Sequence, residues 1–156
     1  MRIRIVAVGR LRAGPERDLV ADYAGRAEKL GRNLGIRAVD LDEVEDRQDR
    51  GKEAEAALLR KALPENGVVI ALDERGKTMA SPDFAALLAE HRDRGTRDLV
   101  FLIGGADGLA PGLVAEADHR LSFGPMVWPH KLARAMLAEQ LYRAASILAG
   151  SPYHRS

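Results

Sequence analysis

Two short apolar runs, residues 68–72 (VVIAL) and 99–103 (LVFLI), constrain the fold of this chain most. Neither run alternates with polar residues, which is typical of strands buried on both faces of a sheet. Segments with helical periodicity precede and follow each run, and strands that alternate with helices indicate a parallel α/β sheet. The chain has 156 residues without repeats or low-complexity linkers, so we expect a single domain over residues 1–156.

Apolar periodicity and the positions of Gly and Pro predict the other elements. Further strands are expected over residues 3–8, 36–41 and 121–123. Helices are expected over residues 15–30, 46–63, 81–92, 111–117 and 129–149. Ser81 is the expected N-cap of the third helix, with Pro82 at its first helical position.

Ligands of parallel sheets bind beyond the carboxyl ends of the strands, where three loops are expected, over residues 73–79, 104–111 and 124–129. The turn Gly104–Gly108 (GGADG) either makes a tight strand-to-helix connection or cradles a phosphate or an adenosine with backbone N–H groups. It lacks the spacing of a dinucleotide fingerprint, and the sequence has no P-loop motif. The segment 123–129 (FGPMVWP) is apolar but irregular, so it either packs into the core or lines a pocket for a flat apolar ligand. Taken alone, the single Trp128 is expected to be buried by packing.

The last helix has an apolar arc so broad that we expect a partner subunit to cover part of it. Its narrower polar side carries Lys131, Glu139, Tyr142, Arg143 and Ser146, and Glu139 with Arg143 forms an i,i+4 pair that is by default a surface salt bridge. The tail, residues 151–156 (SPYHRS), either frays or uses its Tyr, His and Arg to stack on a base, handle a proton and hold phosphate.

Charge is nearly balanced, at +1 overall, but it is unevenly distributed. Residues 1–37 carry +5, residues 38–118 carry −8, and residues 119–156 carry +4, so a basic face forms if the two ends meet. Of the 24 basic residues 19 are Arg, which suits phosphate binding, although genomic base composition explains an Arg-rich chain equally well.

Several function classes are disfavoured by residues that the sequence lacks. Without cysteine or an H-x-x-x-H pattern we expect no metal site and no thiol nucleophile, and His91 and His119 have no visible partner set. No apolar run reaches membrane-spanning length and the first residues are not a signal peptide, so we expect a cytoplasmic protein that does not contact membranes.

Five motifs, together with VAVG near the start, resemble the ribosomal RNA large subunit methyltransferase H family, a minimal branch of the SPOUT methyltransferases. The motifs are residues 71–77 (ALDERGK), 101–108 (FLIGGADG), 129–134 (PHKLAR), 139–144 (EQLYRA) and 152–155 (PYHR). The resemblance covers the whole chain. It implies an α/β SPOUT-type parallel sheet flanked by helices, with a C-terminal trefoil knot. It also implies a homodimer that uses S-adenosyl-L-methionine to methylate N3 of a pseudouridine in a stem-loop of 23S rRNA, on assembled ribosomes.

When the functional residues of the family are carried over to the matching motifs, the resemblance implies two groups of site residues. The cofactor contacts fall on Leu72, Gly104, Phe123, Gly124, Pro125, Met126, Val127 and Trp128. The nucleotide is faced by Arg143, Tyr153, His154 and Arg155, with the tail reaching towards the partner's cofactor. His154 is either a general base for the N3 proton or a substrate anchor.

The chain departs from the family pattern at two places. Ala106-Asp107 replaces the Pro-Glu that is usual in the family, and the 123–128 loop is bulkier than the loop that is usual there. Two other functions remain as alternatives, a non-catalytic ribosome- or RNA-binding module and a nucleotide-binding enzyme such as a dehydrogenase. The absent G-x-G-x-x-G motif disfavours the dehydrogenase.

Overall fold

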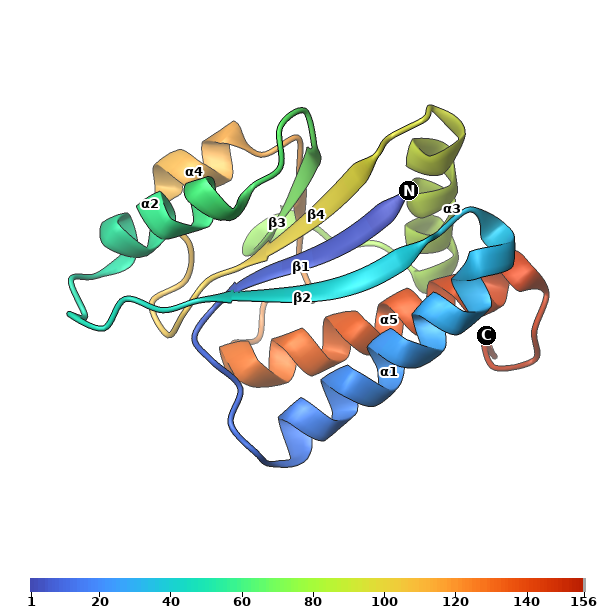
Figure 1. Cartoon of the computed structure of the whole chain (residues 1–156), viewed down its shortest axis with the longest axis horizontal. Coiled ribbons are helices and arrows are strands. Elements are labelled where there is room, and N and C mark those ends of the chain that lie inside the picture. Colours follow the sequence, from blue (N-terminus) through green and yellow to red (C-terminus); the bar gives the residue numbers. More distant parts are fainter. Residues whose placement is uncertain (156) are drawn as a thin grey trace.

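The computed structural model describes residues 1–155 and has a five-stranded, fully parallel sheet (Figure 1). The strands run in the order β2-β1-β4-β3-β5 and are β1 (Arg2–Val8), β2 (Ala38–Val44), β3 (Val68–Lys77), β4 (Asp98–Ile103) and β5 (His119–Leu121). The helices are α1 (Pro15–Gly31), α2 (Lys52–Ala62), α3 (Ser81–Asp93), α4 (Pro111–Glu116) and α5 (His130–Ala149), with a 3-10 turn η1 (Arg32–Leu34) after α1. The predicted parallel α/β sheet flanked by helices is therefore confirmed.

Helices cover both faces of the sheet, which explains the unbroken apolar runs. On β4, Phe101 packs into the core shared with α1, α3 and α5, while Val100 and Leu102 pack into the core shared with α2 and α4. Strand β1 divides its residues in the same way. Because residues 99–103 of β4 and residues 5–8 of β1 each meet one apolar layer or the other, none of these positions is polar.

The largest error in the predicted elements concerns residues 46–51, which were assigned to a helix. Helix α2 begins only at Lys52. The Asp46 carboxylate accepts hydrogen bonds from the backbone N–H groups of Gln48 (3.3 Å) and Arg50 (2.7 Å), and Asp49 adopts a positive φ of 49°. An Asp that binds the backbone two residues further on favours a turn over a helix. The strands predicted at 36–41 and 121–123 lie instead at Ala38–Val44 and His119–Leu121.

Two side chains have other roles than the sequence predicted. Ser81 is not an N-cap, because Ala80 occupies that position, and the Ser81 hydroxyl donates instead to Gln140 Oε1 at 2.8 Å. Ser146 was placed on the polar side of the last helix but is fully buried, with its hydroxyl donating to the Arg143 carbonyl oxygen at 2.7 Å.

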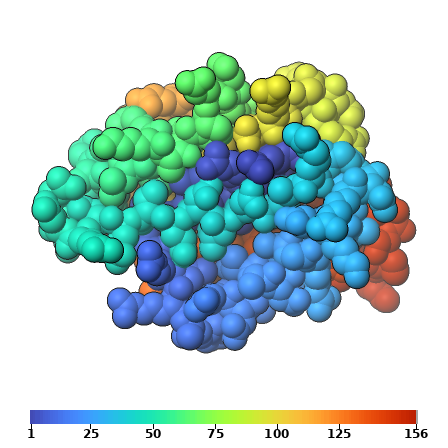
Figure 2. Space-filling view, viewed as in Figure 1, coloured from blue at the N-terminus to red at the C-terminus, as the bar shows by residue number. Residues whose placement is uncertain are grey.

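The basic N-terminal and C-terminal segments lie next to each other, which is the arrangement that a shared basic face requires. Helix α1 packs along α5, and Figure 2 shows the last residues, in red, beside the blue of the first helix. Within the chain, α1, α3 and the sheet cover much of the apolar arc of α5, while Leu132, Met136, Ile147 and Leu148 stay half-buried, so coverage of the rest by a partner subunit stays a prediction. The trefoil knot and the single-domain organisation stay predictions.

Candidate functional site

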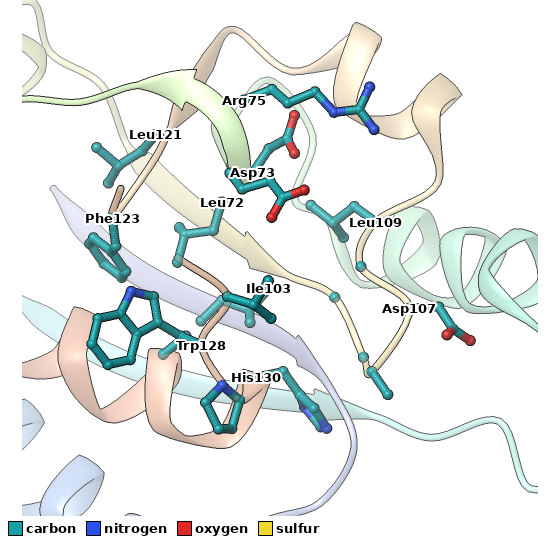
Figure 3. A pocket seen from close by; sticks show the side chains of 18 of the residues that line it. Leu72, Asp73, Arg75, Ile103, Asp107, Leu109, Leu121, Phe123, Trp128 and His130 are labelled. Carbon is teal, nitrogen blue, oxygen red and sulfur yellow. The ribbon is translucent and has the colours of Figure 1, made fainter. Parts of the chain in front are cut away.

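The three loops predicted at the carboxyl edge of the sheet meet in one cavity of about 680 Å³. Its lining includes Leu72 to Arg75 within β3, Ile103 to Leu109 at the end of β4 and beyond it, and the segment around Phe123 after β5. This volume is within the range of small-molecule sites. Figure 3 shows Phe123 and Trp128 on one side of the cavity and Asp107 and Leu109 on the other.

A bulge in β3 forms part of this cavity. Leu72 and Lys77 both pair with Leu121, so the four residues between them are pushed out of the ladder. The bulge packs closely on β5, since a Cβ at Gly76 would lie 2.9 Å from the carbonyl oxygen of Arg120. Of residues 73–79, predicted as a loop, residues 73–77 are therefore an irregular strand end whose first residues line the cavity.

The Gly-rich turn after β4 is tight and also lines the cavity. A Cβ at Gly104 would lie 2.7 Å from the carbonyl oxygen of Gly108, so any other residue there would displace the turn. The N–H of Gly108 donates to the carbonyl oxygen of Gly105 at 3.0 Å. The tight-turn interpretation of these glycines is thus correct, and it places the backbone of the turn beside the ligand space.

The apolar loop after β5 packs against the core through Phe123 and lines the cavity with Phe123, Met126, Val127 and Trp128. Met126 is 72% exposed, Val127 84% and Trp128 41%, so the expectation of a buried Trp128 is wrong. Ser122 holds the start of the loop: its hydroxyl contacts the Glu74 carbonyl oxygen at 3.0 Å and accepts from the N–H of Gly124 at 3.0 Å. The loop presents a flat apolar surface to the cavity and to solvent.

Carboxylates surround the opposite part of the cavity. Asp73, Glu74 and Asp107 line it, and Glu55 of α2 lies next to the Gly-rich turn, where a Cβ on Gly105 would be 3.1 Å from its Oε2. Burial, followed by the charge of Asp107, raises the pKa of Glu55. Lys52 and Arg75 also line the cavity, so its polar part carries both signs of charge with carboxylates in excess, which suits a ligand that has both an aromatic and a positively charged part.

His130, at the first turn of α5, brings an unpaired polar atom to the cavity. Its Nδ1 is buried and has no hydrogen-bond partner within residues 1–155, although His130 lines the cavity. Burial, and then the charges of Arg134 and Lys131, lower the pKa of His130, so the neutral imidazole is favoured. A buried, unpaired ring nitrogen is a candidate contact for a bound ligand.

The residues predicted to face the nucleotide form a second cluster, further along α5. Glu139 Oε1 accepts from Arg143 Nη2 at 2.6 Å and from the Tyr153 hydroxyl at 3.1 Å. Arg143 Nη1 lies 3.3 Å from His154 Nδ1, and its guanidinium stacks 4.9 Å from the centre of the Tyr153 ring. The Glu139–Arg143 pair is therefore the partly buried anchor of the tail, and the default surface salt bridge is the wrong interpretation.

Aromatic packing extends this cluster to α1. The Tyr153 ring lies 4.5 Å from that of Tyr142, which lies 6.2 Å from that of Tyr23. Burial, with hydrogen bonding to Tyr23 and Glu139, raises the pKa of Tyr153 to about 12. The tail is thus folded back on its own helix, while Arg155 remains exposed. Ser156, the last residue of the predicted tail, lies outside the described residues.

The structure gathers the residues within each of the two predicted groups, but it does not place both groups at the same cavity. Seven of the eight predicted cofactor residues line the cavity at the strand ends, and Pro125 does not. Among the described residues, none of Arg143, Tyr153, His154 and Arg155 lines that cavity. Sequence reasoning missed His130 and the central position of Glu139, although both lie within motifs, PHKLAR and EQLYRA, that carried the family resemblance.

The two histidines without visible partners are partners of each other. His91 Nε2 lies 3.0 Å from His119 Nε2, and the His91 side chain is buried. This pair joins the end of α3 to the start of β5. It lies at the amino ends of the strands, so it belongs to the scaffold.

With this geometry in place, comparison with known proteins identifies the family. The family described as "Predicted SPOUT methyltransferase" matches residues 1–154. A curated relative from Dinoroseobacter shibae, named ribosomal RNA large subunit methyltransferase H, is 64% identical over 99% of both chains. The chain belongs to this methyltransferase family. A second relative of the same name, from Roseobacter denitrificans, is 61% identical over the full length of both proteins.

Solved structures similar to this family member agree on the fold. A probable methyltransferase from Bordetella pertussis matches with a TM-score of 0.55 at 14% identity, covering 92% of this chain and 93% of its own. A probable methylase family protein from Haemophilus influenzae matches with a TM-score of 0.52 at 15% identity, covering 99% of this chain and 70% of its own. Within residues 1–155, no three His, Cys, Asp or Glu side chains gather as metal ligands, and no helix is long and apolar enough to cross a membrane.

Proposed function

We propose that the protein is a cytoplasmic, homodimeric methyltransferase that uses S-adenosyl-L-methionine to methylate N3 of a pseudouridine in 23S rRNA, on assembled ribosomes. The named relatives support rRNA of the large subunit as the substrate, at 61–64% identity over nearly the whole chain. The finer assignment to the pseudouridine rests on the motif resemblance. The observation that carries the proposal is the cavity at the strand ends, which has an apolar wall facing a group of carboxylates.

The cavity fits S-adenosylmethionine in chemistry as well as volume. In this proposal Phe123, Trp128 and Leu72 pack against the adenine, and the backbone of the turn at Gly104 contacts the nucleoside. The carboxylates of Asp73 and Asp107 attract the sulfonium and the amino group, which are both positively charged. This chain has Asp107 where the family usually has Glu. Because the Asp side chain is one carbon shorter than Glu, its carboxylate reaches the positively charged groups of the ligand only if the ligand lies near the Gly-rich turn.

The reaction depends more on positioning N3 against the methyl group than on activating the methyl donor. The sulfonium supplies an activated methyl group, so a bond forms from N3 to the methyl carbon while the carbon–sulfur bond breaks. The proton on N3 must leave before or during this attack. Arg143 and Arg155 are then suited to stabilise the negative imide or to hold a phosphate of the RNA.

The contact between Arg143 and His154 bears on the two roles left open for His154. Arg has no hydrogen-bond acceptor, so in this contact His154 Nδ1 must be the acceptor. The lone pair that a general base needs is therefore directed at Arg143. This arrangement favours His154 as an anchor that offers its N–H to the nucleotide, and a base role requires Arg143 to move away first.

Separation of the two clusters supports the homodimer. In one chain the tail is folded on α5, while the cofactor residues gather at the strand ends. We propose that the tail of one copy faces the nucleotide at the cavity of the other copy, so that two chains complete each site.

The decisive experiment measures methyl transfer and binding together. Purified protein, 70S ribosomes and methyl-labelled S-adenosylmethionine should yield label at a single pseudouridine of 23S rRNA. The fluorescence of the single Trp128, which lines the cavity, should change with S-adenosylmethionine or its demethylated product and not with NAD. Ribosome binding without label transfer or a fluorescence response would support the non-catalytic binding module instead.

A further inference from the structure

A second cavity of about 480 Å³ adjoins the first. Leu121, Phe123 and Gly124 line both cavities, so only the start of the β5 loop separates them. Met79, Phe84 and Met136 give the second cavity apolar walls. Its polar lining consists of Thr78, Ser81, Ser122, Glu139 and Gln140.

The amide of Gln140 has a fixed orientation in this lining. Its Nε2 donates to Glu139 Oε2 at 3.1 Å, and because an ionised carboxylate only accepts, the amide nitrogen must face Glu139. The amide oxygen therefore faces Ser81, whose hydroxyl donates to it at 2.8 Å. One N–H and one oxygen lone pair of Gln140 are not used by these two contacts, and both lie in the plane of the amide.

Two other polar groups of the lining are already occupied. Glu139 Oε1 accepts from Arg143 and Tyr153, and its Oε2 accepts from Gln140. The Ser122 hydroxyl is bound to the backbone of Glu74 and Gly124. Gln140 thus presents a free N–H donor and a free oxygen acceptor to this lining, groups that can bind one edge of a flat heterocycle, and Thr78 adds a hydroxyl to the same wall.

We propose that this second cavity receives the target base, turned out of the RNA stem-loop, and that Gln140 distinguishes pseudouridine from uridine. The proposal rests on the function proposed above. Pseudouridine is attached to its sugar through C5, so its ring has an N1–H donor next to the C2 carbonyl oxygen. The Gln140 amide oxygen accepts from N1–H, and its free N–H donates to that carbonyl oxygen.

Uridine presents a different edge in the same orientation. Its C5–H takes the position of N1–H, while its C4 carbonyl takes the position of the C2 carbonyl. The Gln140 oxygen then faces a carbon and loses a hydrogen bond, which corresponds to about a tenfold loss of rate. N3 lies on the far side of the bound carbonyl in both bases, and the proposal requires that it be turned to the wall at Phe123 and Gly124, which the methyl-donor cavity shares.

The test compares two substrates and two variants. Single-turnover methyl transfer is measured on ribosomes that carry the pseudouridine and on ribosomes made without the pseudouridine synthase, which carry uridine there. Gln140→Met keeps the length of the side chain and removes both hydrogen-bonding groups. The matched control is Gln48→Met, an exposed Gln before α2 that lines neither cavity.

We expect Gln140→Met to lower the rate on pseudouridine, which loses two hydrogen bonds, about tenfold more than the rate on uridine, which loses one, so that discrimination is lost. The Gln48→Met enzyme should discriminate like the unchanged protein. The inference is overturned if Gln140→Met still discriminates, if it slows both substrates equally, or if gel filtration shows an altered assembly, since the cavity would then be a subunit contact. Failure of the unchanged protein to methylate either ribosome would instead refute the proposed function.

Discussion

Arg134 on α5 donates a 2.9 Å hydrogen bond to the carbonyl oxygen of Val8, the last residue of β1. The same guanidinium donates to the Gly9 carbonyl oxygen at 3.0 Å and pairs with Glu43 at 2.9 Å. Arg134 is fully buried, and burial lowers its pKa while Glu43 opposes that effect. One buried side chain therefore fixes the start of α5, which carries His130, against the ends of β1 and β2.

Replacing Arg134 should destabilise the protein strongly. Arg134→Met removes three contacts and leaves the acceptors on Val8, Gly9 and Glu43 without this partner, which costs about 3 kcal/mol for a buried pair. Urea unfolding measures the change. The control Arg2→Met breaks the exposed pair with Asp40 and should cost less than about 0.5 kcal/mol. Equal losses for the two variants would contradict the structural role of Arg134.

Stability should fall as the pH is lowered through 6.5. Burial, and then the charge of His119, hold the pKa of His91 below its ordinary value of 6.5. The unfolded chain therefore binds the proton more tightly than the folded protein, so acid favours unfolding. The free energy of unfolding should be lower at about pH 5.5 than at about pH 7.5. His91→Gln, which keeps an amide beside His119, should reduce this pH dependence, and an undiminished dependence would exclude the pair as its source.

Removing the charge of Glu139 should loosen the tail. Glu139→Gln loses the ion pair with Arg143 and the strong acceptor of the Tyr153 hydroxyl, which together contribute about 1 kcal/mol in a partly buried setting. Amides of residues 151–155 should exchange faster with solvent, and the pKa of Tyr153 should fall from about 12 towards 10.0 in an ultraviolet titration. Glu90→Gln breaks the exposed pair with Arg94 and should leave both measurements unchanged.

Salt should weaken ribosome binding far more than binding of S-adenosylmethionine. RNA binding releases counterions from phosphates, whereas the methyl donor has no phosphate. Arg10 and Arg12 are exposed in the segment after β1, at the same edge of the sheet as the cavity. Arg10→Gln combined with Arg12→Gln should reduce the logarithmic salt slope by about 2, and Arg94→Gln, at the opposite edge, should not. An unaltered slope in the double variant would remove this segment from the RNA-binding surface.

The sequence predicted the strands and the ligand edge because both depend on local patterns. Apolar runs mark β3 and β4 since both faces of the sheet are covered, and Gly or Pro marks each loop that follows a strand. The error at residues 46–51 has a local cause that periodicity does not detect, the Asp46 carboxylate bound to its own backbone. The bulge in β3 was missed because it depends on where β5 pairs, which no segment of β3 encodes.

Contacts between distant side chains were beyond sequence reasoning. Ser81 is a plausible N-cap by position, but its hydroxyl binds Gln140, 59 residues away. The spacing of Glu139 and Arg143 is that of an ordinary surface pair, but in the structure the tail folds back and covers them. Arg134 lies on a helix face among apolar residues, where its buried carbonyl partners belong to the first strand.

The attachment of α5 to β1 also bears on how the chain folds during translation. Val8 precedes Arg134 by 126 residues, so their contact forms only after the segment that contains α5 has left the ribosome. Until α5 emerges, the face of β1 and β4 that it covers stays exposed, and this nascent chain should depend on chaperones. An enzyme proposed to act on completed ribosomes would thus acquire its own site only after the ribosome that makes it has synthesised α5.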